Sequence, residues 1–297
     1  MAKMYPKRIS RASLPQYKQF DEAVKAALDD DGRMDKIHLW EPTDAETLEI
    51  IFSCFRSVKL LSLSSIRLWK LGVGDVGVRA LCEYLTDNAE VQVLDVLDNG
   101  ITEVGCQYLG ALFAANASKL KIRKLMLDHN TIGDEGLKLL CDGLRRSPHI
   151  EEVSLSYCGL GPDAANYLQQ LLMHVDSKLE VLNIQGNAIG AQGCYQLLRA
   201  LEINKRLKTI NISDNQIGEE KLFVDQLLKT LDANNTIFSV NLSYNGVYEP
   251  TARLVLEQQR NKKQTKVDLT DRFDYAFSEE YNVFMSKIKP KVVKKGK

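Results

Sequence analysis

The sequence predicts an α/β solenoid, in which parallel strands line a concave face and helices cover the convex face. Three observations point to this fold. An aliphatic phrase returns six times between Val91 and Val247, its copies lie 28 to 31 residues apart, and apolar stripes with helical spacing lie between them. Repeats of this kind stack side by side, because a single repeat cannot bury its own apolar face. The expected shape is a horseshoe of about seven to eight repeats.

Each copy of the phrase has the form Leu-x-x-Leu-x-Leu-x-x-Asn-x-Leu, with aliphatic substitutions. In the Leu-x-Leu part of the phrase, every second residue is apolar. This alternation predicts a short strand whose alternate side chains point inward. The predicted strands are centred on Leu94, Leu125, Val153, Leu182, Ile210 and Val240. Asparagine stands five residues after the centre in five copies, and Cys158 stands there in the sixth. Because an unpaired buried backbone group costs about 1–3 kcal/mol, we expect these side chains to bond to the backbone of neighbouring turns.

Helices are predicted between the strands from leucines that recur four residues apart. Gly136, for example, is followed by Leu140 and Leu144, which lie on one face of a helix. Stripes with the same offsets follow Gly77, Gly105, Ala164 and Gly193. A full helix after each strand is typical of long repeats.

Two weaker repeats precede these six. Ile37–Leu39 predicts a first strand, and Val58–Leu63 predicts a second that is separated from its helix by five extra residues. We expect the extra residues to form a protruding loop that contains Arg67, Leu68 and Trp69. Tryptophan and arginine dominate interface hot spots, so the loop is a candidate anchor for a partner. The alternative is that Leu68 folds inward and Trp69 packs on a neighbouring loop.

The predicted organisation has three parts. Residues 1–33 form a basic arm and a capping helix, residues 34–262 form the solenoid, and residues 263–297 form an aromatic cap and a basic tail. The capping helix is expected over Leu14–Leu28, where apolar residues recur at helical spacing. The aromatic residues after position 272 are either a cap on the last repeat or a docking segment for another protein.

The charges divide the chain into an acidic body and two basic ends. Lysine plus arginine and aspartate plus glutamate both number 39, but residues 1–11 and 287–297 hold ten of the basic residues and no acid. The remainder therefore carries a net charge of −10. Such ends are typical of solvated arms; the alternative is contact with an acidic partner, although nucleic acid is not the partner we expect.

The sequence holds no motif for catalysis, metal binding or membrane insertion. The four histidines and six cysteines are scattered, and neither a zinc-type spacing nor a phosphate-binding loop is present. The chain shows no signal peptide and no apolar stretch of the roughly 20 residues that a membrane span needs. We therefore expect a cytoplasmic protein with reduced thiols, without enzymatic activity, cofactor or small-molecule substrate.

The exposed side of the predicted strands is the candidate site. Its N-terminal half carries apolar, aromatic and acidic residues, whereas its C-terminal half carries mostly Ser, Asn and Gln. Large exposed apolar patches mark contact sites, although a cap folded over Trp40 is the alternative. The candidate protein-binding residues on this face are Trp40, Asp95, Leu97, Met126, Asp128 and Tyr157. We expect partners to bind there, at the Trp69 loop and at the tails.

The phrase Asn-x-Ile-Gly-x-x-Gly at Asn130–Gly136 and Asn187–Gly193 resembles the ribonuclease-inhibitor class of leucine-rich repeats over roughly residues 58–247. This resemblance implies function through protein–protein contact. It suggests a scaffold subunit of a larger cytoplasmic, cytoskeletal or ciliary assembly. The alternative is a regulator of a small GTPase, similar to the activator of Ran, but the basic C-terminal end differs from the acidic tail typical of that activator.

Overall fold

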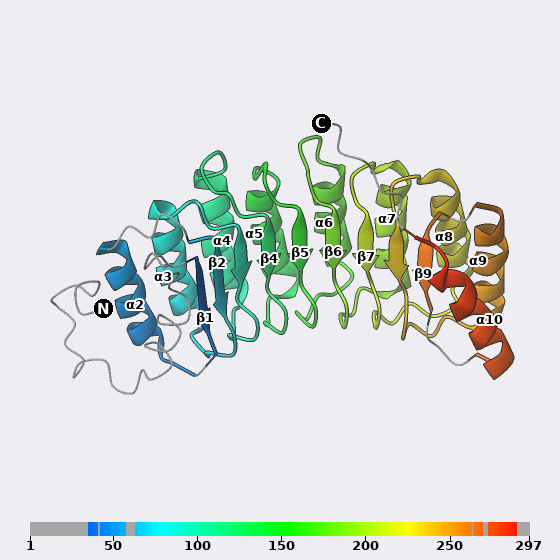
Figure 1. The fold of residues 1–297 in the computed structure, drawn as a ribbon, viewed down its shortest axis with the longest axis horizontal. Coiled ribbons are helices and arrows are strands. Elements are labelled where there is room, and N and C mark those ends of the chain that lie inside the picture. The colour runs from blue at the N-terminus through cyan, green and yellow to red at the C-terminus, as the bar shows by residue number, and fades with distance from the viewer. Residues whose placement is uncertain (1–34, 41, 58–62, 263, 270–272, 290–297) are drawn as a thin grey trace. The chain divides into compact units, whose positions relative to one another are not determined.

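The computed structural model describes residues 35–40, 42–57, 63–262, 264–269 and 273–289. These residues divide into two compact units, of which the first ends at Gly159 and also includes Asp176–Lys178. Strands and helices alternate along the chain in both units (Figure 1). The predicted capping helix at residues 14–28, the basic segment 1–11 and residues 290–297 lie outside the described residues.

The first unit contains five strands that pair in sequence order, and every pair is parallel. The strands form one layer and the helices the other (Figure 1). The elements are β1 Lys36–Leu39, α2 Ala45–Ser57, β2 Ser65–Leu68, α3 Gly74–Asp87, β3 Val93–Asp95, α4 Glu103–Ala115, β4 Lys124–Met126, α5 Gly133–Leu144 and β5 Glu152–Ser154. 

The second unit repeats this arrangement with four strands, β6 to β9, which are also parallel and in sequence order. Its elements are α6 Ala164–Met173, β6 Val181–Asn183, α7 Gly190–Ile203, β7 Thr209–Asn211, α8 Lys221–Ala233, β8 Ser239–Asn241, α9 Glu249–Lys262, β9 Lys266–Asp268 and α10 Tyr275–Ser286. The predicted alternation of parallel strands and helices is confirmed in both units. 

The predicted position of the second strand is wrong. The strand is β2, and its Ile66 pairs with Ile37 on one side and Leu94 on the other. Ile66 lies 29 positions after Ile37 and 28 positions before Leu94, which is the ordinary repeat length. The second repeat therefore contains no insertion. The segments Val58–Leu63 and Leu63–Leu68 have the same aliphatic spacing, and Leu71 occupies the usual asparagine position, so no polar residue distinguished the two registers.

The predicted asparagine ladder is confirmed and is fully buried. Asn130 accepts hydrogen bonds at Oδ1 from the backbone N–H groups of Asn99 and Ile101, both at 3.0 Å. Its Nδ2 donates to the carbonyl of Val96 at 3.0 Å. Cys158 takes the same place in the next repeat, where its thiol donates to the carbonyl of Leu127 at 3.3 Å. Burial raises the pKa of the Cys158 thiol to about 12, which keeps it in the donating form.

A second row of asparagines, which the sequence analysis missed, lies where the helices end. In the second unit, Asn234 donates from Nδ2 to the carbonyl of Asn204 at 3.0 Å, and its Oδ1 accepts from the N–H of Ile237 at 2.8 Å. Asn204 donates in turn to the carbonyl of Leu172 at 2.7 Å. These contacts satisfy carbonyl groups that a helix C-terminus leaves without intrahelical partners.

Helices α4 and α5 approach each other closely at two glycines. A Cβ atom added at Gly143 would lie 2.2 Å from the carbonyl oxygen of Gly110, and one added at Gly110 would lie 2.3 Å from the carbonyl oxygen of Leu139. Both clashes are with backbone atoms, which cannot rotate away as a side chain can. This close packing therefore depends on the absence of side chains at the two positions.

Helix α10 packs on the last strand of the second unit and on α9. Phe277, Tyr281 and Met285 are buried, and the Tyr281 hydroxyl donates to the carbonyl of Val267 in β9 at 3.0 Å. The guanidinium of Arg253 in α9 lies 4.3 Å from the centre of the Phe277 ring. The aromatic residues of this segment therefore cover β9, while Tyr275 remains exposed.

We predict that Asn130→Ala lowers the free energy of unfolding by roughly 2–4 kcal/mol. The substitution removes the side-chain hydrogen bonds to two buried N–H groups and two buried carbonyl groups. Urea-induced unfolding followed by circular dichroism measures the change. The matched control is Asn166→Ala on the exposed face of α6, which is expected to change stability by less than about 0.5 kcal/mol. Equal effects of the two substitutions would contradict the ladder's role.

We also predict that Gly143→Ala destabilises the fold by about 1–3 kcal/mol through overpacking against α4. Alanine is favoured over glycine in a helix interior by about 1 kcal/mol. A loss of stability in Gly143→Ala would therefore come from the clash and not from helix propensity. The same unfolding experiment tests it, with Asp142→Ala as the neighbouring exposed control. A stabilised Gly143→Ala variant would show that α4 and α5 can separate without cost.

Candidate functional site

The parallel pairing of the first unit brings one row of outward side chains together on its strand layer. Inward residues such as Ile66 and Leu94 are buried, and the residue after each points to the opposite side of the strand. The register aligns this outward row as His38, Arg67, Asp95, Met126 and Ser154.

A second row follows just beyond the ends of the strands. Backbone pairing continues there, since the N–H of Lys70 donates to the carbonyl of Leu97 at 2.9 Å and that of Asp98 donates to Asp128 at 3.0 Å. The N–H of His129 likewise donates to the carbonyl of Ser156 at 2.8 Å. This second row consists of Trp40, Trp69, Leu97, Asp128 and Ser156.

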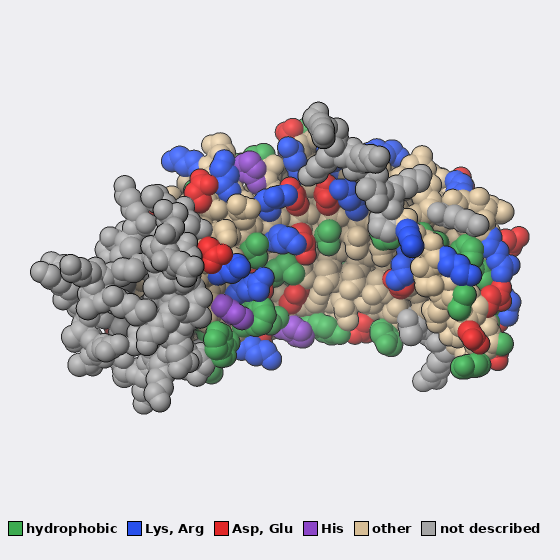
Figure 2. Space-filling view, in the orientation of Figure 1, with side chains coloured by type: hydrophobic (Ala, Val, Ile, Leu, Met, Phe, Trp, Pro, Cys, Tyr) green, Lys and Arg blue, Asp and Glu red, His purple; other side chains and the backbone are tan. Residues whose placement is uncertain are grey.

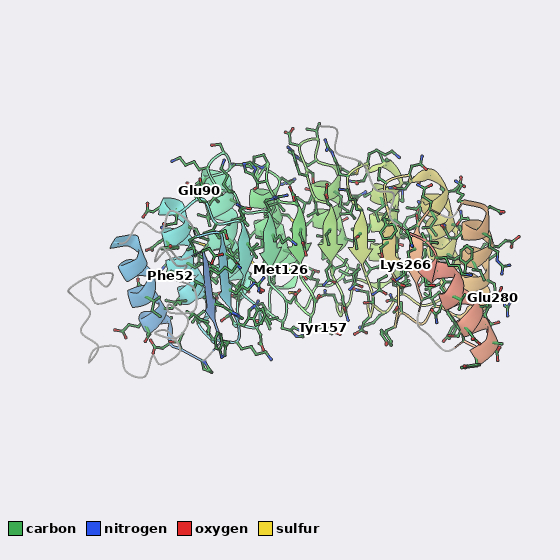
Figure 3. The ribbon with its side chains drawn as sticks, in the orientation of Figure 1. Phe52, Glu90, Met126, Tyr157, Lys266 and Glu280 are labelled. Atoms are coloured by element: carbon green, nitrogen blue, oxygen red, sulfur yellow. The ribbon has the colours of Figure 1, made fainter. Side chains whose placement is uncertain are left out.

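We call these two rows together with Tyr157 the N-terminal strand face. It carries hydrophobic, charged and histidine side chains (Figure 2). Met126 lies on β4 and Tyr157 lies beyond the carboxyl end of β5 (Figure 3). Trp40 and Tyr157 are 48% and 42% exposed, while Leu97 and Met126 are half-buried. The face therefore presents apolar surface to solvent over neighbouring strands.

An aromatic cluster occupies the β1–β2 end of this face. The ring of His38 makes edge contacts with Trp40 and Trp69, with centroid distances of 5.1 and 4.4 Å. The guanidinium of Arg67 lies 6.0 Å from the centre of the Trp69 ring. Burial, followed by the charge of Arg67, lowers the pKa of His38, and the charge of Asp95 opposes this shift. A neutral His38 suits the apolar rings around it.

Two carboxylates occupy the centre of the face. Burial raises the pKa of Asp95, and the negative charge of Asp128 adds to this effect. The Nε1–H of Trp69, the amide of Leu97 and the charge of Arg67 oppose it. The Trp69 N–H lies outside hydrogen-bonding geometry, so its effect on the pKa of Asp95 is electrostatic.

Asp128 is fixed in position by its neighbours on β5. Its Oδ1 atom accepts a hydrogen bond from the Ser154 hydroxyl and another from the Ser156 backbone N–H, both at 2.6 Å. Tyr157 follows in the next turn, where its ring stacks on His129 at a centroid distance of 4.8 Å. Both His129 and Tyr157 have left-handed backbone conformations, in which non-glycine residues are uncommon.

Charged residues at the amino ends of the same strands are already paired. Lys124 in β4 pairs with Glu152 in β5 at 2.5 Å, and Arg123 pairs with Glu151 at 2.5 Å. These ion pairs run across adjacent strands and neutralise one another. Asp95 and Asp128 differ from these residues, since neither forms an ion pair with a described residue.

The strand layer of the second unit is chemically different. Asn211 donates from Nδ2 to the side chain of Gln185 at 3.1 Å and accepts at Oδ1 from the hydroxyl of Ser213 at 2.8 Å. Asn241 accepts at Oδ1 from the N–H of Ser243 at 3.0 Å. These polar groups bond to one another and carry no charge, so this face offers weaker anchors for a partner.

The structure places eight of the nine predicted site residues on one face. Arg67 and Trp69 lie beside Trp40 and Leu97 in the regular rows, so the prediction of a separate protruding loop is wrong. Leu68 is 1% exposed and belongs to the core, because it is the second inward residue of β2. The sequence analysis left His38 and His129 out of the site, although the strand register indicates that His38 points outward.

The described residues show no site for a metal ion: no group of three or more His, Cys, Asp or Glu side chains is placed to hold one. None of the described helices is both long enough and apolar enough to span a bilayer.

The comparisons with known proteins agree with this architecture. A leucine-rich repeat family model matches residues 119–141 and 175–198. The chain is 28% identical over 159 residues to NACHT, LRR and PYD domains-containing protein 3 of Rattus norvegicus, which covers 53% of this chain and 12% of that protein.

Ribonuclease inhibitors are similar over comparable lengths. The inhibitor of Sus scrofa is 32% identical over 142 residues, covering 47% of this chain and 30% of the inhibitor. That of Mus musculus is 29% identical over 197 residues, covering 57% and 42%. In each of these matches the chain spans less than half of its relative. The chain is therefore a leucine-rich repeat protein, related to ribonuclease inhibitor and to the leucine-rich repeat regions of NACHT, LRR and PYD domains-containing proteins.

Proposed function

We propose that this chain is a non-catalytic protein-binding scaffold and that its N-terminal strand face holds the partner. One observation carries this proposal. The face combines exposed Trp40 and Tyr157 with half-buried Trp69, Leu97 and Met126, whereas the two equivalent rows of β6 to β8 carry amides and hydroxyls.

The residue types on this face are those that contribute most to binding energy. Tryptophan, tyrosine and arginine are enriched among hot-spot residues, and methionine is enriched at interfaces. When a partner covers exposed apolar surface of this kind, the complex gains about 25 cal/mol of free energy per Å² removed from water. The repeat fold does not require Trp69, Leu97 and Met126, because the equivalent positions of β6 to β8 hold amides and hydroxyls. Tyr157, in contrast, has a counterpart in the exposed Tyr244 of the second unit.

The relationship to ribonuclease inhibitor supports a binding role, since that protein's name states that it inhibits another protein. We extend the proposal to a subunit of a larger assembly, for which a cytoplasmic, cytoskeletal or ciliary setting is our hypothesis. The basic ends are further candidate contacts, but the central prediction concerns the strand face alone.

We predict that Trp40→Ala and Met126→Ala each reduce capture of the partner by at least about 10-fold, which corresponds to about 1.4 kcal/mol of binding energy. The tagged full chain is purified from its native source, and the co-purified chains are quantified by mass spectrometry. Both side chains are at least partly exposed, so circular dichroism should show an unchanged fold.

The matched control is Tyr248→Ala, which removes a 55% exposed aromatic side chain from the second unit. It should leave capture unchanged. If all three variants retain the same proteins at the same yield, the N-terminal strand face is not the binding surface. The identity of the retained chains also tests the proposed cytoskeletal or ciliary setting.

A further inference from the structure

We infer that the partner of the N-terminal strand face supplies an arginine side chain that binds between Asp95 and Asp128 and pairs with both carboxylates. This inference rests on the proposed function and specifies the chemistry of the partner. It follows from the charges of the face, from the apolar groups around them and from comparison with the second unit.

The first argument is that these two carboxylates have no cation of their own. Among the described residues, neither Asp95 nor Asp128 forms an ion pair, whereas Asp98 pairs with Lys70 at 3.9 Å and Glu152 pairs with Lys124 at 2.5 Å. Arg67 is near enough to influence Asp95 electrostatically, but it forms no ion pair with that carboxylate. Within the part of the chain that the structure describes, no cation pairs with either carboxylate, so a cation of the partner would supply the complementary charge.

The second argument concerns the mutual repulsion of the pair. Asp95 in β3 pairs with Met126 in β4, and Asp128 lies two residues beyond Met126, so the two acids are diagonal neighbours on adjacent strands, roughly 7–8 Å apart. The charge of Asp128 disfavours ionisation of Asp95, and half-burial weakens the screening by water. A cation placed between the two carboxylates would lower the pKa of Asp95 toward its ordinary range.

The third argument is that the fold does not need carboxylates here. In β6 to β8 of the second unit, the position of Asp95 is held by Asn183, Asn211 and Asn241, and the position of Asp128 by Gln185, Ser213 and Ser243. These strands pair in the same way with uncharged residues, and the aspartate at this position in β9, Asp268, pairs with Lys266 at 2.7 Å. The two acids are therefore a local property of the face and not a requirement of the turn.

Arginine fits the surroundings better than lysine or a metal ion. Its planar guanidinium binds carboxylates with paired hydrogen bonds and is more weakly hydrated than an ammonium group. It can also stack on aromatic rings, and Trp69 lies beside Asp95. The described residues provide too few ligands for a metal site.

The flanking side chains define the rest of the partner segment. Leu97 and Met126 are half-buried next to the two acids, so apolar residues beside the arginine would cover them. We therefore expect a segment in which the arginine lies between leucine-like residues. The aromatic cluster around Trp69 and the stacked ring of Tyr157 would border it.

The test uses two peptides, acetyl-Leu-Arg-Leu-amide and acetyl-Leu-citrulline-Leu-amide, which differ only in the charge of the central side chain. Each is titrated into the ¹⁵N-labelled full chain, and the indole N–H signals are followed by NMR. The chain has two tryptophans, so the Trp69 signal is assigned with a Trp40→Phe variant. We expect the arginine peptide to shift the Trp69 signal and to bind about fivefold or more tightly than the citrulline peptide.

Asp95→Asn and Asp128→Asn should each reduce this preference to twofold or less. The matched control is Asp214→Asn, which makes the same change at an exposed turn of the second unit and should preserve the preference. Equal affinity of the two peptides, absence of a shift with the arginine peptide, or full preference in Asp95→Asn would each overturn the inference.

The purification experiment separates this inference from the proposed function. If Trp40→Ala and Met126→Ala release the partner but Asp95→Asn and Asp128→Asn do not, the face binds a protein without using an arginine. If the peptides behave as expected but Trp40→Ala and Met126→Ala retain the partner, the acidic pair recognises arginine, but the apolar side chains that carry the proposed function do not hold the partner.

Discussion

The structure depends on pairing the backbone groups that are buried where each strand ends. Side chains such as Asn130 bond to two N–H groups of the preceding repeat and to carbonyls of the preceding repeat and of their own repeat. An unpaired group at this depth would cost about 1–3 kcal/mol. The ladder therefore holds successive strands in one register, and this register aligns the outward residues of different repeats in straight rows.

The same turns fix the backbone conformation next to the N-terminal strand face. The residue before the ladder position is left-handed in several repeats, including Asp98, His129 and Tyr157. Non-glycine residues in this region cost of order 1 kcal/mol or more, and the surrounding ladder holds them there. The strained turn raises the Tyr157 side chain to the rim of the N-terminal strand face, where it is 42% exposed. A cost of folding thus contributes to the shape of the surface.

The sequence was sufficient to predict most strands, because the spacing of the inward aliphatic residues and the position of the polar ladder residue together fix where each strand lies. It failed at β2, where Val58–Leu63 and Leu63–Leu68 fit the same spacing and Leu71 carries no polar signal. Only pairing with Ile37 and Leu94 distinguishes the two registers. The second asparagine row, at positions such as Asn204 and Asn234, was missed because its role depends on where each helix ends.

The candidate site shows a similar limit. The outward direction of Asp95 and Met126 follows from period 2 alone. Their partial burial depends on how side chains of adjacent strands pack, and so does the pairing of charges: Asp95 and Asp128 form no ion pair among the described residues, whereas Lys124 pairs with Glu152. Arg67 was assigned to a loop because one misplaced strand shifts every neighbouring residue. In the register of the structure it joins the row of His38 and Asp95.

The difference between the two units indicates where specificity resides. Both use the same parallel pairing and the same asparagine turns, so the fold constrains their strand layers equally. In the second unit, groups such as Asn211 and Ser213 already satisfy one another, and a partner would have to break those bonds to form its own. In the first unit, the apolar side chains of the N-terminal strand face are partly exposed, and Asp95 and Asp128 form no ion pair with a described residue, although Asp128 accepts hydrogen bonds from Ser154 and Ser156. A partner that covers the apolar groups and adds a cation would therefore gain free energy there without breaking an ion pair.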